Sequence, residues 1–259
     1  MPNRRCCAVK IIEVRDYKEM SQKAAEWIIH QVRINPHSVL GLATGGTMLG
    51  TYAALVEDYR NHQTTYRHVH TVNLDEYVGL DGDHPNSYRY YMNHHFFHFI
   101  DIPPSQTHIP NGLAENVEAE CQRYEEVIES VGGIDLQIVG IGQNGHIGFN
   151  EPGTSFDSTT HVVELAESTR KANARFFSSI EEVPTHAITM GIATIMKSKQ
   201  ILLLASGEGK ATILAQLLET EVTPAIPASI LKTHDNVTIM ADQKALALVS
   251  EEQRKVYAQ

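Results

Sequence analysis

The stretch Ile134-Asp135-Leu136-Gln137-Ile138-Val139-Gly140-Ile141 is a nearly continuous apolar run that leads into a glycine-rich loop over residues 142–153. Such runs are typical of strands that are buried on both faces, as in parallel sheets. Parallel strands are joined by crossover connections, which are usually helices. The stretch therefore predicts an α/β fold in which strands and helices alternate on either side of it.

The rest of the chain does alternate in this way. Strands are predicted over 8–14, 38–43, 69–74, 186–190, 200–205 and 237–241, and helices over 17–32, 48–59, 87–97, 117–131, 210–218 and 243–250. The alternation predicts right-handed βαβ units in a mainly parallel, doubly wound sheet. Because no linker, repeat or low-complexity tract interrupts it, we expect one domain over residues 1–259.

Composition excludes several classes of protein. The 259 residues include 21 Lys and Arg against 31 Asp and Glu, a net charge of −10. This acidity argues against binding to nucleic acid or to anionic lipid. The chain lacks an apolar run of the ~18 residues needed to span a membrane. Lys10 and Glu13 interrupt the segment that would follow a signal sequence. Three cysteines, two of them the adjacent Cys6 and Cys7, favour a reducing cytoplasm over a disulfide framework.

The first chemically informative loop is Thr44-Gly45-Gly46-Thr47, between a predicted strand and a predicted helix. Glycines let backbone N–H groups approach an anion, and the following helix N-terminus adds a favourable dipole. The pattern lacks the spacing of a nucleotide P-loop. It fits either a phosphate-binding loop or a tight turn with a threonine helix cap.

Two acidic residues follow the predicted strand over 69–74. A desolvated carboxylate at a strand end has a raised pKa and can act as a base. Taken alone, however, the pair Asp75-Glu76 is more typical of a helix cap or a solvated surface.

The loop over 142–153 places His146 in a glycine-rich turn, with Glu151 five positions later. Histidine moves protons near neutral pH, and a neighbouring carboxylate can orient the ring and stabilise its charged form. A structural hydrogen bond is the commoner reason for one such pair. The flanking glycines favour a functional role, because they keep side chains out of the space beside the ring.

Two basic residues could bind an anion, although a solvated surface charge is the ordinary interpretation of either. Arg175 lies in Ala172-Asn173-Ala174-Arg175-Phe176-Phe177, and Lys210 begins a predicted helix. A cation is disfavoured at a helix N-terminus unless an anion is present, so Lys210 departs from the ordinary case.

The histidines at positions 94, 95 and 98 could suggest a metal site. No carboxylate or cysteine ligand stands beside them, and Phe96 and Phe97 are interleaved with them. We therefore expect a helix that packs its aromatic rings and exposes its histidines, and we assign no metal.

Four segments together resemble the glucosamine-6-phosphate deaminase family, in that family's order and over nearly the whole chain. They are Leu42–Thr47, Asn73–Leu80, Gly145–Pro152 and Ala172–Phe177. The resemblance implies a Rossmann-like α/β/α sandwich that converts glucosamine 6-phosphate to fructose 6-phosphate and ammonia. The implied partner is a small sugar phosphate. Family members include monomers and hexamers, so the oligomeric state stays open.

The resemblance also implies roles for individual residues. The family's phosphate loop corresponds to Thr44, Gly45, Gly46 and Thr47, and its phosphate-binding cations correspond to Arg175 and Lys210. Its proton-shuttling aspartate corresponds to Asp75, and its ring-opening histidine to His146 with Glu151 as the supporting carboxylate. One base moves a proton between adjacent carbons, so no metal or redox cofactor is implied.

The sequence departs from the allosteric members of the family at two places. They carry an aspartate where this chain has Asn144, whose amide oxygen could still orient an imidazole but adds no charge, so Glu151 would carry more of that role. Their basic effector-binding residues correspond to His161 and Val163, and their C-terminus is longer. We therefore expect no strong activation by N-acetylglucosamine 6-phosphate.

Three other functions compete with this interpretation. A 6-phosphogluconolactonase has a similar glycine–histidine loop but needs no carbon-proton shuttle, and Phe149-Asn150-Glu151-Pro152 favours the deaminase. A sugar-phosphate sensor fused to a transcription regulator would carry a DNA-binding segment. Galactosamine 6-phosphate, which differs at C4 only, stays open as a substrate. Whether the loop after Gly148 closes as a lid also stays open.

Overall fold

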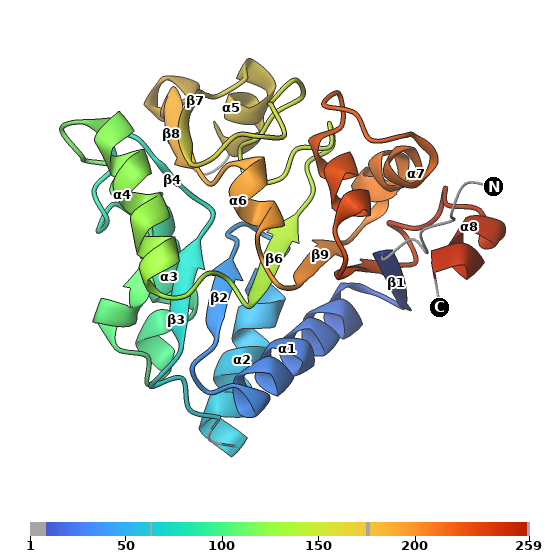
Figure 1. The fold of residues 1–259 in the computed structure, drawn as a ribbon, viewed down its shortest axis with the longest axis horizontal. Helices are drawn as coiled ribbons and strands as arrows, with labels where there is room; N and C mark the ends of the chain where they lie inside the picture. The colour runs from blue at the N-terminus through green and yellow to red at the C-terminus, as the bar shows by residue number, and fades with distance from the viewer. Residues whose placement is uncertain (1–8, 63, 175–176, 258–259) are drawn as a thin grey trace.

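Seven parallel strands form the central sheet of the computed structural model, which describes residues 9–62, 64–174 and 177–257 (Figure 1). Their spatial order is β1 (Val9–Val14), β10 (Val237–Asp242), β9 (Ile201–Ala205), β6 (Leu136–Gly140), β2 (Val39–Leu42), β3 (His70–Asn73) and β5 (Thr107–His108). Every neighbouring pair is parallel. The predicted mainly parallel α/β fold is confirmed. Cys6 and Cys7 lie outside the described residues.

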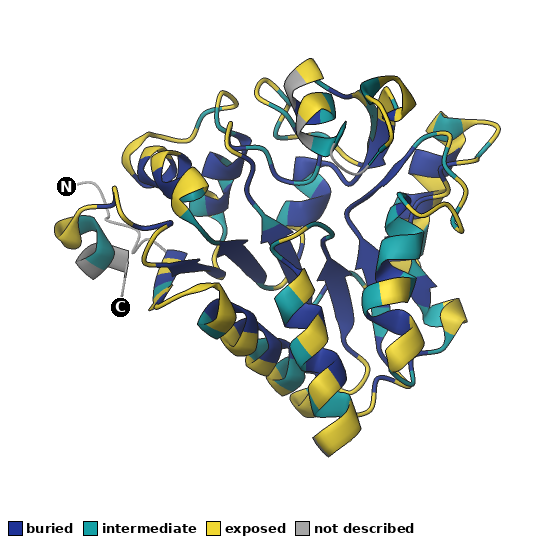
Figure 2. Cartoon of the chain, turned by 180° about the vertical axis from the view of Figure 1, so that it is seen from behind, coloured by how far each residue is buried: buried dark blue, intermediate teal, exposed yellow. Residues whose placement is uncertain are grey.

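Helices flank the sheet, and most of them begin where the sequence predicts. They are α1 (Tyr17–Ile34), α2 (Leu49–His62), α3 (Tyr88–His95), α4 (Val117–Ser130), α5 (Glu167–Asn173), α6 (Ile192–Met196), α7 (Ala211–Glu219) and α8 (Glu251–Tyr257). The side chains of Asp16, Ser87 and Asn116 cap α1, α3 and α4 by accepting a backbone N–H three residues later. The outer faces of the helices are exposed, whereas the strands are buried (Figure 2).

The apolar run around β6 is buried on both faces. Its one amide side chain, Gln137, is fully buried and donates to the carbonyl of Ile138 at 2.8 Å. Gly41 on the neighbouring strand β2 makes room for it, since a Cβ there would lie 2.1 Å from the Gln137 amide oxygen. A buried polar side chain is thus accommodated inside the sheet by a glycine next to it.

A second, antiparallel sheet was not predicted. It consists of β4 (Asp75–Tyr77), β8 (His186–Thr189) and β7 (His161–Glu164). In Figure 1, β7 and β8 lie beside α5 at the top of the view, and β4 lies below them. We expected the strand over 69–74 to end at Asp75-Glu76, but the chain continues into β4, where Asp75 pairs with Thr189. The predicted strand over 186–190 also belongs to this sheet.

The predicted C-terminal helix over 243–250 is wrong. That segment forms turns, and the helix α8 begins at Glu251. Asp242 accepts the N–H of Ala245 at 2.8 Å, which starts the turn directly after β10. Ser250 and Gln253 then exchange side-chain hydrogen bonds with each other's backbone N–H groups, a capping box that starts α8.

The strand order reverses direction between β2 and β6. From β2 the chain proceeds to β3 and β5 on one side, whereas from β6 it proceeds to β9 and β10 on the other. A reversal of this kind opens a crevice at the carboxyl ends of the strands, which is where ligands bind in open α/β sheets.

Candidate active site

A cavity of about 810 Å³ lies at this reversal of strand order. It is lined by residues that follow β2, β3 and β6, together with residues from α3, α5 and the segment before α7. Eight of the ten predicted site residues line it: Thr44, Gly45, Gly46, Thr47, Asp75, Asn144, His146 and Lys210. Glu151 contacts two of these from behind. Arg175 lies outside the described residues.

Asp75 is the buried acid of the cavity. It is 7% exposed and is held in the extended strand β4 by pairing with Thr189. Burial, and after it the neighbouring charge of Glu76, raises the pKa of Asp75 to about 8. A carboxyl group with such a pKa is matched to proton abstraction near neutral pH.

Glu76 points away from Asp75 in the strand and has a structural role. It is 2% exposed, and its carboxylate accepts the backbone N–H groups of Tyr77, Tyr88 and Arg89, each at 2.9 Å. Burial raises the pKa of Glu76, and these hydrogen bonds oppose the shift. The carboxylate thus caps α3 and keeps a second acid beside Asp75.

His146 and Glu151 form the second group of the site. The Nδ1 atom of His146 lies 3.5 Å from Oε2 of Glu151. The same carboxylate accepts the amide of Asn144 at 2.5 Å and the hydroxyl of Thr169 at 2.6 Å. Burial would raise the pKa of Glu151, but the hydrogen bonds and the charge of His146 outweigh it and lower the pKa to about 2. Glu151 is therefore ionised and can orient the imidazole.

Asn144 contacts Glu151 rather than the imidazole. Its amide oxygen accepts the backbone N–H of His146 at 3.2 Å, while its amide nitrogen donates to Glu151. We expected the amide oxygen to be available for the histidine ring. The structure instead uses Asn144 to hold the turn and to fix the carboxylate that approaches the ring.

Two glycines provide space for these side chains, as the sequence predicted. A Cβ on Gly142 would lie 2.2 Å from the ring of His146. A Cβ on Gly148, whose φ is +57°, would lie 3.0 Å from the Thr189 hydroxyl and 3.7 Å from the Asp75 carboxylate. Neither position has room for a larger residue without moving the site.

The loop over 44–47 and Lys210 meet in the same cavity. Gly45 has a φ of +100°, which an L side chain rarely adopts. The ammonium of Lys210 donates to the carbonyl of Ile141 at 2.6 Å, and burial lowers its pKa. A half-buried cation that lines one cavity with a glycine-rich loop is suited to binding an anion.

His94 and His95 end α3, and His98 lies in the 3-10 turn that follows it. Phe96 and Phe97 are buried, and His94 and His98 are exposed, as predicted, whereas His95 is half-buried. The ring of His94 stacks on Tyr90. Within the described residues there is no group of three or more His, Cys, Asp or Glu side chains that could hold a metal ion.

Sequence reasoning missed several residues that line the cavity, among them Tyr88, Gln143, Thr169 and Asn173. Thr169 and Asn173 are four residues apart on α5, so they share one face of that helix. The spacing was a usable signal, but the short helix itself was not predicted.

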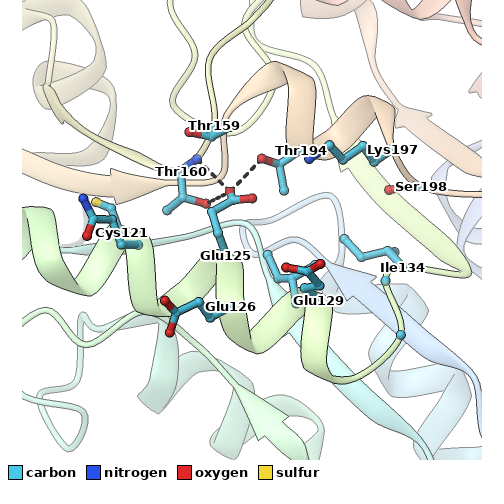
Figure 3. A pocket seen from close by; sticks show the side chains of 14 residues that line it. Cys121, Glu125, Glu126, Glu129, Ile134, Thr159, Thr160, Thr194, Lys197 and Ser198 are labelled. Atoms are coloured by element: carbon cyan, nitrogen blue, oxygen red, sulfur yellow. Dashed lines mark hydrogen bonds between the residues drawn. The ribbon is translucent and has the colours of Figure 1, made fainter.

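A second cavity of about 730 Å³ lies between α4, α6 and the segment before β7 (Figure 3). At its centre, one oxygen of Glu125 accepts the backbone N–H and hydroxyl of Thr160 and the hydroxyl of Thr194, at 2.8, 2.5 and 2.6 Å. Cys121, whose pKa burial and the charges of neighbouring acids raise to about 11, also lines it. Such a thiol is a poor nucleophile, and the acid is engaged in connecting three elements.

None of the helices in the described part of the chain is long and apolar enough to cross a bilayer.

Comparison with known proteins supports one family. The family described as glucosamine-6-phosphate isomerases/6-phosphogluconolactonase matches residues 15–240. A glucosamine-6-phosphate deaminase of Geobacillus sp. (strain WCH70) is 69% identical over 250 residues, covering 96% of this chain and all of the relative. Glucosamine-6-phosphate deaminase 1 of Bacillus subtilis (strain 168) is 52% identical over 240 residues, covering 93% of this chain and 99% of the relative.

Solved structures agree with this result. The structure of a monomeric glucosamine-6-phosphate deaminase superposes with a TM-score of 0.91 at 52% identity, covering 92% of this chain and 99% of that one. A 6-phosphogluconolactonase from Thermotoga maritima, 21% identical with a TM-score of 0.73, covers 91% of this chain and all of its own, and shares the fold. The chain therefore belongs to the glucosamine-6-phosphate isomerase/6-phosphogluconolactonase family.

Proposed function

We propose that this protein is a glucosamine-6-phosphate deaminase, which converts glucosamine 6-phosphate and water to fructose 6-phosphate and ammonia. The observation that carries the proposal is the buried Asp75, with a pKa of about 8, in one cavity with His146. Relatives of this name support it, because this chain aligns with all of one of them and with 99% of another.

Ring opening is the first step. The amino sugar enters as a closed pyranose. His146 gives a proton to the ring oxygen as the C1–O bond breaks, and the imidazole left neutral then takes the proton of the C1 hydroxyl, which gives the open aldehyde and restores the charged ring. The ionised Glu151, 3.5 Å from Nδ1, stabilises the charged imidazole. Thr169 and Asn144 hold that carboxylate in place.

Proton transfer and deamination follow. Asp75 removes the proton from C2 of the open aldehyde, which gives an enolamine, and returns it to C1. The resulting C2 imine reacts with water to give the ketone and releases ammonia. Because one base transfers a proton between adjacent carbons, this sequence of steps requires no metal or redox cofactor.

The phosphate group positions C2 for this transfer. The loop Thr44-Gly45-Gly46-Thr47 and the ammonium of Lys210 supply donors on one side of the cavity. Arg175 is assigned a second phosphate contact by the family resemblance. Holding the reacting carbon in place can supply a large part of the rate acceleration. Because a charged sugar phosphate is retained in the cytoplasm, we place the enzyme there as well.

Lactone hydrolysis is the competing activity. It needs an activated water but no base for a C–H bond, so the raised pKa of Asp75 favours the deaminase. Galactosamine 6-phosphate would follow the same chemistry and is an alternative substrate.

A coupled assay tests the proposal. Glucosamine 6-phosphate should yield equal amounts of ammonia and fructose 6-phosphate, and Asp75→Asn should reduce kcat by at least ~10³-fold, as expected when the only base is removed. Galactosamine 6-phosphate and 6-phosphogluconolactone are run in parallel. Failure of the native protein to release ammonia would refute the function, and full activity of the variant would refute the role of Asp75.

A further inference from the structure

Three tyrosine hydroxyls converge on the loop that precedes α2, and they come from three different helices. Tyr17 of α1 donates to the carbonyl of Gly46 at 3.0 Å, and Tyr91 of α3 donates to the carbonyl of Gly45 at 2.8 Å. Tyr52 of α2 donates to the carbonyl of Ala43 at 2.5 Å. Three carbonyls within four residues thus have a side-chain donor.

Packing holds Tyr52 and Tyr91 in position, and hydrogen bonds hold Tyr17, which is exposed. Tyr52 is 2% exposed, and its ring packs edge-on against Tyr91 with centroids 6.3 Å apart. Burial, and then the neighbouring Tyr17, raises the pKa of Tyr91, so its hydroxyl stays a donor. The hydroxyl of Tyr17 also accepts the N–H of Gly50 at 2.8 Å, which connects the loop to the first turn of α2.

Peptide planarity links these carbonyls to the opposite face of the loop. In a trans peptide the C=O of one residue and the N–H of the next point in opposite directions. Holding the carbonyls of Ala43, Gly45 and Gly46 against the tyrosines therefore turns the N–H groups of Thr44, Gly46 and Thr47 away from them. All three of these residues line the cavity.

Those N–H groups are free to bind a ligand. Within the residues that the structure describes, the N–H groups of Thr44, Gly46 and Thr47 donate to no protein acceptor, whereas Met48 N–H donates to the carbonyl of Gly45. Unpaired donors aimed at a cavity form a concave anion site. Lys210 adds a cation to the same cavity.

We propose that Tyr17, Tyr52 and Tyr91 are positioning residues that hold the loop over 43–47 with its N–H groups turned toward the substrate's phosphate. They do not touch the reacting carbons. The inference rests on the proposed function for the identity of the anion, but the loop's affinity for an anion can be measured separately. The tyrosines set how strongly the phosphate binds, so they should change KM and leave kcat nearly unchanged.

Removal of single hydroxyls tests the proposal. Tyr91→Phe and Tyr17→Phe keep the rings, so packing is preserved. Each should raise KM for glucosamine 6-phosphate, and the dissociation constant for inorganic phosphate measured by calorimetry, about three- to tenfold, as for one weakened hydrogen bond. The kcat should stay within about twofold, because at saturation Lys210 and the remaining donors still hold the phosphate, and so C2, in place. The lost contact is made in the ground state and the transition state alike.

Tyr90→Phe is the matched control. Tyr90 lies on the same helix, stacks on His94, and its hydroxyl makes no hydrogen bond to the residues that the structure describes. It should leave KM and phosphate affinity unchanged. If Tyr91→Phe and Tyr17→Phe match this control, or lower only the melting temperature, the inference is wrong.

The two proposals fail separately. If the native protein binds phosphate but releases no ammonia, and the variants still weaken phosphate binding, the deaminase function is refuted and the positioning role stands. If ammonia is released normally but all variants bind phosphate alike, the positioning role is refuted and the function stands. A native protein that binds no phosphate in this assay also refutes the positioning role.

Discussion

Asp75 combines two properties that conflict in energetic terms. Its position in β4 buries the carboxyl, and Glu76 adds a negative charge beside it, so the pKa rises to about 8. The same shift that makes a usable base destabilises the folded state wherever an unfolded aspartate would be ionised. Asp75 is therefore expected to be a site where activity and stability oppose each other.

Replacing Asp75 by asparagine should stabilise the protein while abolishing activity. Between pH 4 and pH 8 the folded state holds a proton on Asp75 that the unfolded state has lost, so stability falls as pH rises. The variant should gain about 1–3 kcal/mol at pH 8.5, a rise in Tm of about 2–10 °C, and less at pH 5.5. Calorimetry at both values checks this, with Asp83→Asn on an exposed loop as the control. A gain that does not depend on pH would contradict the argument.

Glu76→Gln should shift the pH–rate profile. The free enzyme needs Asp75 ionised, so kcat/KM should fall as pH drops below about 8. Removing the neighbouring charge lowers the pKa of Asp75, and the acid limb should move down by about one pH unit. Stability should drop as well, because the new amide N–H group meets the backbone N–H groups that begin α3. An acid limb that stays in place would show that burial alone sets the pKa of Asp75.

Some site residues could be predicted from the sequence and others could not. His146 was found because it lies in a glycine-rich turn after a recognisable buried strand. Asp75 received its role only through the family resemblance, since an acidic pair at a strand end is by itself typical of a helix cap or a solvated surface. Thr169 was missed, because it lies on α5, 18 residues after Glu151, and contacts Glu151 only through the way α5 packs on the loop. The spacing of Thr169 and Asn173 could mark one face of a helix, but which carboxylate that face contacts depends on tertiary packing.

At the scale of elements, Glu125 joins α4 to two neighbours. The three hydrogen bonds to one carboxylate oxygen connect α4 to the segment before β7 and to α6 (Figure 3). Thr160 and Thr194 are buried, 6% and 2% exposed, so their donors have no access to bulk water as an alternative. The antiparallel sheet is attached to the core partly through this one side chain.

Glu125→Ala should therefore destabilise the fold by about 2–4 kcal/mol, because buried donors would be left without an acceptor. Glu126→Ala is the matched control: it lies on the same helix, is exposed, and should change stability by less than about 0.5 kcal/mol. Urea unfolding of both variants measures the difference. Equal midpoints for the two would contradict this account of Glu125.

The strands differed in how well the sequence predicted them. The strands β6 and β9 inside the parallel sheet are buried on both faces, so their apolar runs stand out, whereas the short edge strand β5, Thr107-His108, was not predicted. The strand β4 consists of Asp75-Glu76-Tyr77, and both acids are buried. Backbone N–H groups hydrogen-bond to Glu76, and Asp75 lines the cavity, which the local sequence does not show. Likewise, Ala245, Leu246 and Val249 are apolar at helical spacing, yet they are buried in turns. The spacing of apolar residues indicates which residues are buried, but it does not show whether they lie in a helix, a strand or a turn.

At the scale of the whole molecule, the net charge of −10 says little about the substrate. The cavity gathers Lys210, unpaired backbone N–H groups and the end of a helix, all local features that attract an anion. The negative total even includes groups with proposed chemistry, Asp75 and Glu151. Charge at this scale affects solubility, whereas local donors decide what binds.

The antiparallel sheet contains the positions that matter for allosteric activation. The family resemblance predicts that His161 and Val163, both in β7, stand where allosteric members carry effector-binding cations. Val163 packs against a buried cluster that includes Tyr77 and Phe149, and Nδ1 of His161 donates to the carbonyl of Thr159 at 2.8 Å. An apolar side chain turned toward the interior offers no contact to a second phosphate. We therefore expect hyperbolic kinetics with glucosamine 6-phosphate, unchanged by N-acetylglucosamine 6-phosphate apart from weak competition at the active site. Initial rates across substrate concentrations, with and without that compound, check this, and a sigmoidal curve that the compound makes hyperbolic would overturn it.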